Sequence, residues 1–372
     1  MQSLFSNALS EATAKHLSVS RTRHETLGWL VVLIVRLGTV SLWRLAAHVA
    51  SEADLASVRR RFYRFFQFVR LDAEIGARIV VGFLGLAGKP WTLAIDRTNW
   101  KLGKTEINIL MICVEWRGIG VPLIFTLLGK AGNSSSAERI DLLGRLKAIF
   151  PDMKIAALTG DREFVGNVWV AWLERQKIPF VLRLKENQHV VRDGHETWPI
   201  ERIAQNLKRG EHTKLKGFCR LGSGGQASGP RVRLVIMRLK TGELLALATN
   251  GRPGLALARY RARWKIETLF ANLKTRGFDL EATHITDPDK LETLLVIMTI
   301  AAALAAKAGA AAHQIRPIPV KKHGRKAVSI FALGLAILRK IFARDLPEQA
   351  SNLIARLLSP NLSPKPLIRL GF

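Results

Sequence analysis

The sequence predicts a mixed α/β protein with three parts: an all-helical N-terminal region, a sheet-containing core and a β-rich segment that interrupts the core. Three observations predict this organisation. Apolar residues recur at helical spacing within residues 1–85. From Trp91 onward, short apolar runs bounded by glycine replace that pattern, as expected of strands. Residues 185–250 are rich in glycine and short β-type runs and lack a long helical period.

In the N-terminal region, the stretch "SLWRLAAHVASEADLASVRRRFYRFFQFVR" predicts two helices around a turn near Ser51. The apolar residues of the second helix share one face, which we expect to be buried: Leu55, Val58, Phe62, Phe65 and Val69. The opposite face carries Ser57, Arg60, Arg61 and Arg64. A helix-turn-helix that places these arginines on DNA and a solvated basic helix in a bundle explain this pattern equally well.

The elements after Trp91 follow in the order β-β-β-α-β-α-β. Three strands are predicted in "WTLAID", "INILMICVEW" and "GVPLIFTLL". A helix opens with a capping box from Ser135 to Glu138, and the strand "KIAALTGD", the helix "NVWVAWLERQ" and the strand "PFVLRL" follow. This is the order of the ribonuclease H fold. We therefore predict a ribonuclease H-like domain over residues 86–184 and 251–310, a β-rich insertion at 185–250 and a basic helical segment at 311–372.

The charge of the chain favours a polyanionic partner. Lys and Arg number 57 against 29 Asp and Glu, which gives a net charge of +28. Nucleic acid is the commonest partner of so basic a folded chain, although a ribosome-associated or peripheral membrane protein also fits. We expect no zinc site or disulfide framework from Cys113 and Cys219 alone. No signal peptide is expected, so the predicted location is the cytoplasm.

Two apolar runs resemble membrane spans but fall short of one. "LGWLVVLIVRLGTVSLW" contains Arg36, and "TLLVIMTIAAALAA" is bounded by Glu292 and Lys307. Each is shorter than the roughly 18 uncharged residues that a span needs. We expect buried helices and no membrane partner.

Two aspartates follow apolar strands. Asp96 ends the first predicted strand, and Asp161 ends "KIAALTGD". Carboxylates at strand ends of an α/β sheet point into the crevice where ligands bind, and two such groups repel each other unless a cation lies between them. Oxygen ligands favour Mg²⁺ or Mn²⁺. Either acid by itself is explained equally well as a polar strand end.

A third acid lies on a predicted amphipathic helix, "YRARWKIETLFANLKTRGF". At about 100° per residue, four polar residues share an arc of about 60°: Tyr260, Arg263, Glu267 and Lys274. The adjoining apolar face is formed by Ile266, Leu269 and Leu273. An ordinary surface helix with an Arg–Glu pair four residues apart is the alternative. It leaves the other two polar residues of the arc unexplained.

These residues also resemble a known family. Tyr260, Arg263, Glu267 and Lys274 reproduce the spacing Y-(2)-R-(3)-E-(6)-K of the YREK pattern in the insertion-sequence-four family of bacterial DDE transposases. "LAIDRTNWKLGKTEINIL" and "ALTGDREF" are similar to the two aspartate regions of that family. "THITDPDKLETLL" and "KKHGRKAVSIF" resemble its downstream segments. The resemblance extends from about Phe62 to about Leu335, and the residues before Ser57 carry no motif that transfers.

The resemblance implies a ribonuclease H-like catalytic domain with a β insertion. Asp96, Asp161 and Glu267 would hold two Mg²⁺ ions, with Mn²⁺ as a substitute, about 3.5–4 Å apart. Arg263 and Lys274 would bind phosphates, Tyr260 would contact the DNA backbone, and Arg162 is a weaker candidate for the terminal nucleotide. We expect base-specific contacts from Arg60, Arg61 and Arg64.

The activity that the resemblance implies is transposition. A homodimer on double-stranded DNA would cut at the ends of an insertion sequence and join them to target DNA. Two alternatives remain open: a ribonuclease H-fold nuclease without strand transfer, and an inactive DNA-binding protein derived from a transposase.

Overall fold

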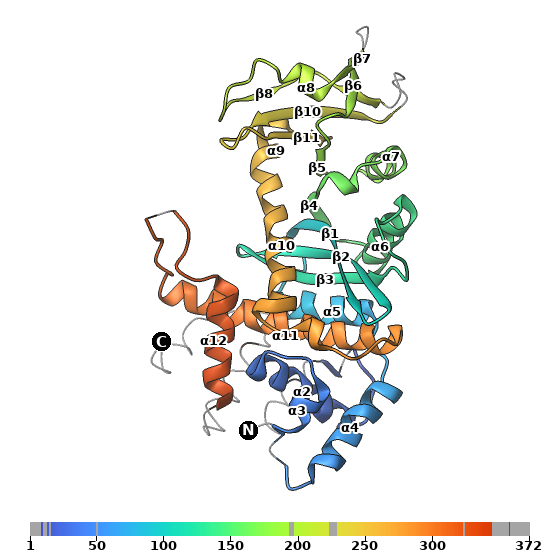
Figure 1. Ribbon diagram of the computed structural model, residues 1–372, viewed down its shortest axis with the longest axis vertical. Coiled ribbons are helices and arrows are strands. Elements are labelled where there is room, and N and C mark those ends of the chain that lie inside the picture. The colour runs from blue at the N-terminus through green and yellow to red at the C-terminus, as the bar shows by residue number, and fades with distance from the viewer. Residues whose placement is uncertain are drawn as a thin grey trace.

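A computed structural model describes residues 9, 13, 14, 16–49, 51–192, 197–222, 229–322, 324–343 and 357. Its N-terminal helices lie together at one end of the molecule, and a long helix, α11 (Pro288–Ile315), lies between them and the sheet (Figure 1). The helices before the sheet are α2 (Arg21–Leu37), α3 (Leu42–Ala46), α4 (Leu55–Phe68) and α5 (Ala73–Leu84). The all-helical prediction is confirmed for the described part of residues 1–85. Whether these helices form a separate domain stays a prediction.

Helix α4 shows why the sequence folds this way locally. Asp54 caps its first turn by accepting a hydrogen bond from the Ser57 backbone N–H at 2.7 Å. Val58, Phe62 and Phe65 face the core, as their spacing predicts, but the Leu55 side chain is 43% exposed. The predicted pair of helices around a turn is therefore present as α3 and α4, with residues 47–54 between them.

The sheet begins with five strands in the order β3-β2-β1-β4-β5. They are β1 (Pro90–Leu102), β2 (Thr105–Trp116), β3 (Ile119–Leu127), β4 (Lys154–Gly160) and β5 (Phe180–Leu184). β1 pairs antiparallel with β2 and parallel with β4, β2 pairs antiparallel with β3, and β4 pairs parallel with β5. The helices α6 (Ser136–Ile149) and α7 (Asn167–Arg175) connect them as predicted. The arrangement is consistent with a ribonuclease H-like core.

One strand is longer than the sequence predicts. We expected β1 to end at Asp96, but it continues to Leu102 because residues 97–102 pair with β2 down to Thr105. Asp96 therefore lies in the middle of a hairpin strand. Asp161 does follow the last residue of its strand, Gly160.

The β-rich segment continues the same sheet. β11 (Leu244–Thr249) pairs antiparallel with β5, and β10 (Arg231–Arg238) pairs with β11. Short strands complete the segment: β6 (His189–Arg192), β7 (Thr197–Pro199), β8 (His212–Lys214) and β9 (Cys219–Gly222), with the helical turn α8 (Ile200–Ile203). The predicted β content is confirmed. Its status as a separate insertion stays a prediction.

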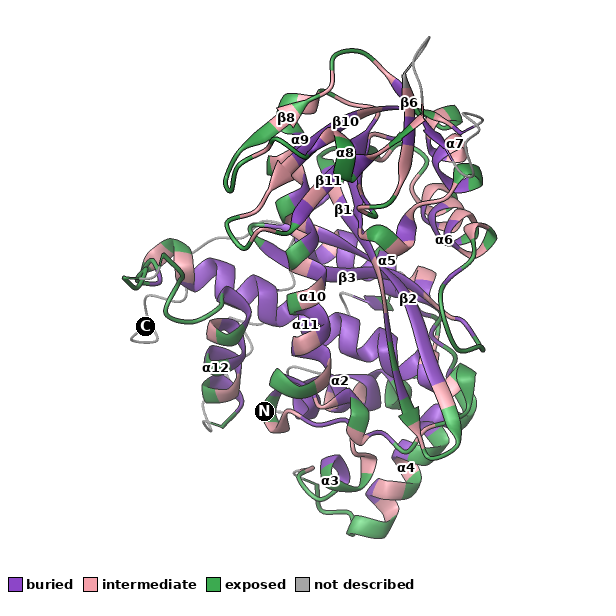
Figure 2. Ribbon diagram, turned by 45° about the horizontal axis from the view of Figure 1, so that its top comes forward, coloured by how far each residue is buried: buried purple, intermediate pink, exposed green. Residues whose placement is uncertain are grey.

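Helix α11 forms the centre of the core. Figure 2 shows it buried along nearly its whole length, and it packs against α2, α5, β3 and α12 (Ile330–Ala343). Among the described residues, it is the one helix long and apolar enough to cross a membrane, but that apolar stretch is wholly buried inside the protein. The apolar run within α2 is buried as well from Leu27 to Val35, except for the partly buried Trp29. In the predicted C-terminal segment, residues 344–356 and 358–372 lie outside the described part of the chain.

Candidate active site

The sheet register brings the two aspartates together. In the parallel pairing of β1 with β4, Ile95 lies opposite Gly160. Asp96 and Asp161 are the next residues on the two strands, so they lie at the same level of the sheet. The sequence analysis predicted this proximity from two apolar runs that each end in an acid.

The third acid comes from a helical segment that is less regular than predicted. It comprises α9 (Pro253–Tyr260), a tight turn at residues 261–263, α10 (Trp264–Ala271) and a wide turn at residues 272–276. As predicted, α10 packs through its buried apolar face, Ile266 and Leu269, against β1 and β3. This contact directs Glu267 toward the aspartates.

Arg263 joins the three acids. Its Nη1 lies 3.6 Å from Oδ2 of Asp96 and 4.0 Å from Oδ2 of Asp161, and its Nη2 lies 2.5 Å from Oε1 of Glu267. The Arg263 side chain is only 7% exposed, against 36% for Glu267. Three carboxylates from distant parts of the sequence thus converge on one guanidinium.

Backbone hydrogen bonds orient both aspartates. The Arg97 N–H donates to Oδ1 of Asp96 at 2.8 Å, and the Glu163 N–H donates to Oδ1 of Asp161 at 2.8 Å. In each residue, Oδ1 is held by the backbone while Oδ2 faces Arg263. Burial, together with repulsion from Asp161 and Glu267, raises the pKa of Asp96 to about 6, although the Arg97 N–H and the Arg263 charge oppose the rise.

The donor chemistry of this cluster fits a hard divalent cation. Three carboxylates supply only oxygen ligands, the set that Mg²⁺ and Mn²⁺ prefer. A cation already lies among them, since the Arg263 guanidinium occupies the place where they point. Within the described ranges, no three His, Cys, Asp or Glu side chains are close enough together to hold a metal directly. Ion binding at this cluster would therefore need the carboxylates to move closer together as well as the guanidinium to leave.

Of the other two residues of the predicted polar arc, Tyr260 lies next to Arg263, whose guanidinium carbon is 5.7 Å from the centre of the Tyr260 ring, and Lys274 lies against β1. Tyr260 is buried, 6% exposed, in a cluster with Val181, Val235 and Leu247. Lys274 donates to the Asn99 carbonyl at 3.0 Å and pairs with Glu281 at 3.0 Å. The tight and wide turns on either side of α10 change the angular position of each residue, so the four do not form one exposed stripe. Their predicted contacts with DNA stay predictions.

Arg162 is exposed and lies beside the acids. With Asp161 it lines a hollow of about 590 Å³. Lys185, Gln188 and Asn167 line the same hollow. This position is compatible with the predicted contact to a terminal nucleotide, which stays a prediction.

The three arginines of α4 differ in their surroundings. Arg60 and Arg64 are exposed. Arg61 is tied to α2: its Nε donates to Oγ1 of Thr26 at 2.8 Å, its Nη2 donates to Oε2 of Glu25 at 3.0 Å, and its guanidinium lies 4.0 Å from the centre of the Trp29 ring. The sequence grouped the three residues by helical spacing, which cannot show that one of them faces a neighbouring helix.

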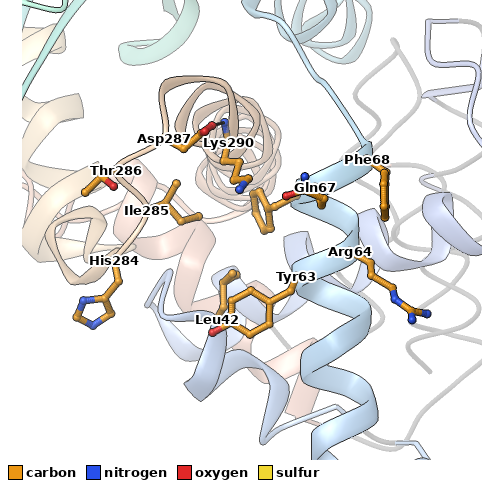
Figure 3. A pocket seen from close by; sticks show the side chains of 11 residues that line it. Leu42, Tyr63, Arg64, Gln67, Phe68, His284, Ile285, Thr286, Asp287 and Lys290 are labelled. Atoms are coloured by element: carbon orange, nitrogen blue, oxygen red, sulfur yellow. Dashed lines mark hydrogen bonds between the residues drawn. The ribbon is translucent and has the colours of Figure 1, made fainter.

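A hollow of about 520 Å³ lies beside α4 (Figure 3). Tyr63 lies next to Leu42 on one side of it, and Ile285 and Lys290, from the segment around the start of α11, line the other. The exposed Tyr63 and Phe68 side chains, 54% and 63% accessible, flank Arg64 along the helix. Aromatic and cationic side chains are therefore available together on this surface.

Two residues beside the aspartates were not singled out in the sequence. Arg97 follows Asp96 directly, and Glu163 lies two residues after Asp161; their side chains form an ion pair with Nε and Oε1 3.2 Å apart. Their position next to predicted catalytic acids was the available signal. Their pairing is a tertiary contact 66 residues apart in sequence, which local patterns do not encode.

Comparison with known proteins gave one family. A family model described as "Transposase DDE domain" matches residues 87–304, more than half of the chain. The matched range contains all three acids, Arg263 and Lys274. A search of curated proteins returned no match.

Proposed function

This chain belongs to the transposase DDE domain family, and from that premise we propose that it is the transposase of an insertion sequence, of the insertion-sequence-four type. It cleaves phosphodiester bonds at the ends of its element and joins those ends to target DNA. The substrate is double-stranded DNA, bound by a homodimer in the bacterial cytoplasm. The convergence of Asp96, Asp161 and Glu267 on one cation is the observation that carries the proposal.

The three carboxylates would hold the divalent cations. When bound, Mg²⁺ or Mn²⁺ supplies activation of the attacking hydroxyl and stabilisation of the leaving oxygen. Asp96 and Asp161 offer their Oδ2 atoms because the backbone holds both Oδ1 atoms. Glu267 is the most exposed of the three side chains and is anchored by a helix, which makes it the ligand best placed to adjust.

Arg263 has two alternative anionic partners in this proposal. In the protein alone it neutralises the three carboxylates. With cations held by the three carboxylates, the guanidinium would be free to bind a DNA phosphate, a partner for which its planar donors are suited. Lys274 and Tyr260 would contact the backbone of the same DNA strand. Arg162 would contact the terminal nucleotide at the neighbouring hollow.

The recognition surface would be α4. Its exposed Arg60 and Arg64 supply the charge, with Tyr63 and Phe68 beside them. The net charge of +28 supports a polyanionic partner. Of the competing functions, an inactive DNA-binding protein derived from a transposase has the least support, because all three acids are present and contact one guanidinium. A nuclease without strand transfer would use the same cluster, and an assay for joined DNA distinguishes it from a transposase.

The test measures cleavage of duplexes that cover the ends of the element, in Mg²⁺, with DNA binding followed by gel shift. Asp96→Asn, Asp161→Asn and Glu267→Gln are each expected to abolish cleavage while end binding remains. Asp141→Asn, an exposed acid on α6, is the matched control and should cut normally. Retained cleavage in any of the three variants would refute the site.

A second assay supplies pre-cut ends and supercoiled target DNA. Joined product is the expected result and identifies a transposase. Cleavage of intact ends without any joined product would identify the nuclease instead.

A further inference from the structure

The Arg97–Glu163 ion pair joins two residues that lie within two positions of the aspartates in the sequence. Arg97 follows Asp96 on β1, and Glu163 follows Asp161 in the short turn after β4. The side chains are 15% and 16% exposed, and Nε of Arg97 lies 3.2 and 3.4 Å from the two carboxylate oxygens of Glu163. The pair therefore bridges the two chain segments that carry the aspartates.

Arg97 is fixed by more than its ionic partner. Its remaining guanidinium nitrogens donate to side-chain amide oxygens of Asn99, Asn108 and Asn133, at 3.3, 3.2 and 3.3 Å. Asn108 is held in turn, since its Nδ2 donates to the carbonyl oxygens of Lys130 and Gly132. All three guanidinium nitrogens donate to protein acceptors, which leaves the group little freedom to bind DNA.

Glu163 is held equally well. Its Oε1 accepts hydrogen bonds from the backbone N–H of Ser134 at 3.1 Å and from its hydroxyl at 3.2 Å. The Ser134 hydroxyl accepts from Nε of the buried Arg139 at 2.8 Å, and the Arg139 guanidinium lies 4.9 Å from the centre of the Phe164 ring. Glu163 thus links the turn after β4 to the residues just before α6 through hydrogen bonds. Its carboxylate contacts Arg97 and Ser134 and forms no ion pair with Arg263 within the described part of the chain.

The same two residues hold the catalytic carboxylates through their backbones. The N–H of Arg97 binds Oδ1 of Asp96, and the N–H of Glu163 binds Oδ1 of Asp161, both at 2.8 Å. Fixing the Arg97 and Glu163 side chains to each other therefore fixes both N–H groups relative to one another. That in turn sets the directions of the two Oδ2 atoms.

We propose that Arg97 and Glu163 are a pair of positioning residues, which hold the two aspartates in the orientation that cation binding requires. This inference rests on the proposed function and adds two residues to its site. Neither side chain touches the substrate or the cations. Groups that orient ligands typically change metal affinity by about 10–100-fold when they are removed.

The test uses the full-length protein without DNA and measures Mn²⁺ affinity by the electron paramagnetic resonance signal of the free ion. Glu163→Gln and Arg97→Gln are each expected to weaken Mn²⁺ binding by about tenfold or more. Because the two side chains act as one unit, the double variant should bind Mn²⁺ about as well as either single variant. A merely structural contribution would instead lower the melting temperature and leave the affinity of the folded protein unchanged.

Glu74→Gln is the matched control. It removes the carboxylate of another partly buried ion pair, Arg145 with Glu74, which joins α6 to α5. It should leave Mn²⁺ affinity unchanged. If a glutamine variant fails to fold, Arg97→Lys keeps the charge opposite Glu163 while losing the planar set of amide contacts, and it should weaken Mn²⁺ binding by a smaller factor.

The two proposals fail in different ways. Wild-type Mn²⁺ affinity in folded Glu163→Gln and Arg97→Gln would overturn the positioning role alone. Wild-type protein that binds Mn²⁺ no better than Asp96→Asn would overturn the proposed function, whatever the Arg97–Glu163 variants do.

Discussion

At the scale of single residues, the main observation is that an arginine takes the place of a cation. Three carboxylates around one point would repel one another if nothing lay between them. Burial, with a smaller contribution from this repulsion, raises the pKa of Asp96 to about 6. Arg263 relieves part of this repulsion from a position that is almost wholly buried. The protein can therefore assemble its acids before any ion or substrate arrives.

Removing this guanidinium should make ion binding easier. Arg263→Gln is expected to tighten Mn²⁺ binding in the absence of DNA by about tenfold, or about 1.4 kcal/mol, because the ion no longer displaces a positive charge. The same variant should cleave DNA more slowly, since the phosphate partner is lost. Titration calorimetry with Mn²⁺ measures the first effect, and Arg261→Gln, on the same turn but exposed, is the control. Weaker Mn²⁺ binding in Arg263→Gln would contradict the displacement.

Sequence patterns could predict the acids but not their immediate partners. Each of the three acids is a polar residue in a mainly apolar segment, which makes it visible in the sequence. The parallel pairing of β1 with β4 brings the two aspartates together, and the packing of α10 on the sheet adds Glu267. The Arg97–Glu163 pair joins residues that are unremarkable in their own segments, so only the folded structure brings them together. For Tyr260 the local pattern was misleading. Its position on an ideal helix predicted a polar face shared with Glu267, but a tight turn follows Tyr260 and its ring is buried in an apolar cluster.

At the scale of elements, the arginines on one face of α4 have different surroundings. Arg61 ties the helix to α2 through Thr26, Glu25 and Trp29, while Arg60 and Arg64 remain exposed. The sequence shows the spacing of all three but not the position of α2. The structure therefore separates one arginine that contacts a neighbouring helix from two that are exposed to solvent.

Substitution should separate these roles. Arg61→Ala is expected to lower the free energy of unfolding by about 1–3 kcal/mol, because it removes hydrogen bonds that involve charged groups. Arg60→Ala and Arg64→Ala should change unfolding by less than about 0.5 kcal/mol but weaken DNA binding. Urea denaturation and gel shifts provide the two measurements. Equal losses of stability in all three variants would contradict the assignment.

The contact of β3 with α10 is close enough to leave no room for a side chain. A Cβ at Gly120 would lie 2.5 Å from the Lys265 carbonyl oxygen, so Gly120→Ala should push α10, and Glu267 with it, away from the sheet. We expect a loss of about 1–3 kcal/mol in unfolding free energy and a loss of cleavage. Gly144→Ala, in α6 with open space around it, is the control and should be neutral or stabilising. Normal cleavage by Gly120→Ala would show that this contact does not position Glu267.

At the scale of the whole molecule, the core contains a buried cation. Lys307, in α11, is fully buried and donates to the Phe83 carbonyl at 2.5 Å. Burial, with a smaller contribution from Arg117, lowers the pKa of Lys307 to about 8 from an ordinary 10.5. Between pH 8 and 10.5, the unfolded chain thus binds more protons at this residue than the folded one does. Below pH 8 the folded protein bears the full free-energy cost of burying the charged lysine. This cost disappears as the pH rises from 8 to 10.5.

The expected consequence is a rise in stability with pH. The free energy of unfolding should gain up to about 3 kcal/mol from this residue between pH 8 and 10.5, and Lys307→Met should lack that gain. Urea denaturation across the window gives the comparison, with exposed Lys104→Met as the control for general effects of charge. Parallel pH profiles in the wild type and Lys307→Met would contradict the lowered pKa.

Much of the fold class was accessible from the sequence because each strand and helix carries its own period. The succession of strands and helices along the chain and the capping box of α6 are such local features, and both were predicted. The continuation of β1 beyond Asp96 was not, since residues 97–102 are polar enough to read as a loop and become a strand by pairing with β2. The joining of β11 to β5 likewise depends on partners more than 60 residues apart.

The position of α11 also bears on synthesis of the protein. α2 and α5 pack against this helix, which lies about 200 residues or more after them in the chain. On the ribosome, the early helices are made first but lack their packing surface until residues 288–315 have emerged. We therefore expect nascent chains stalled before that helix to be digested rapidly by protease, and chains stalled well after it to resist. If α4 binds DNA as proposed, that binding would begin only after α11 has been made.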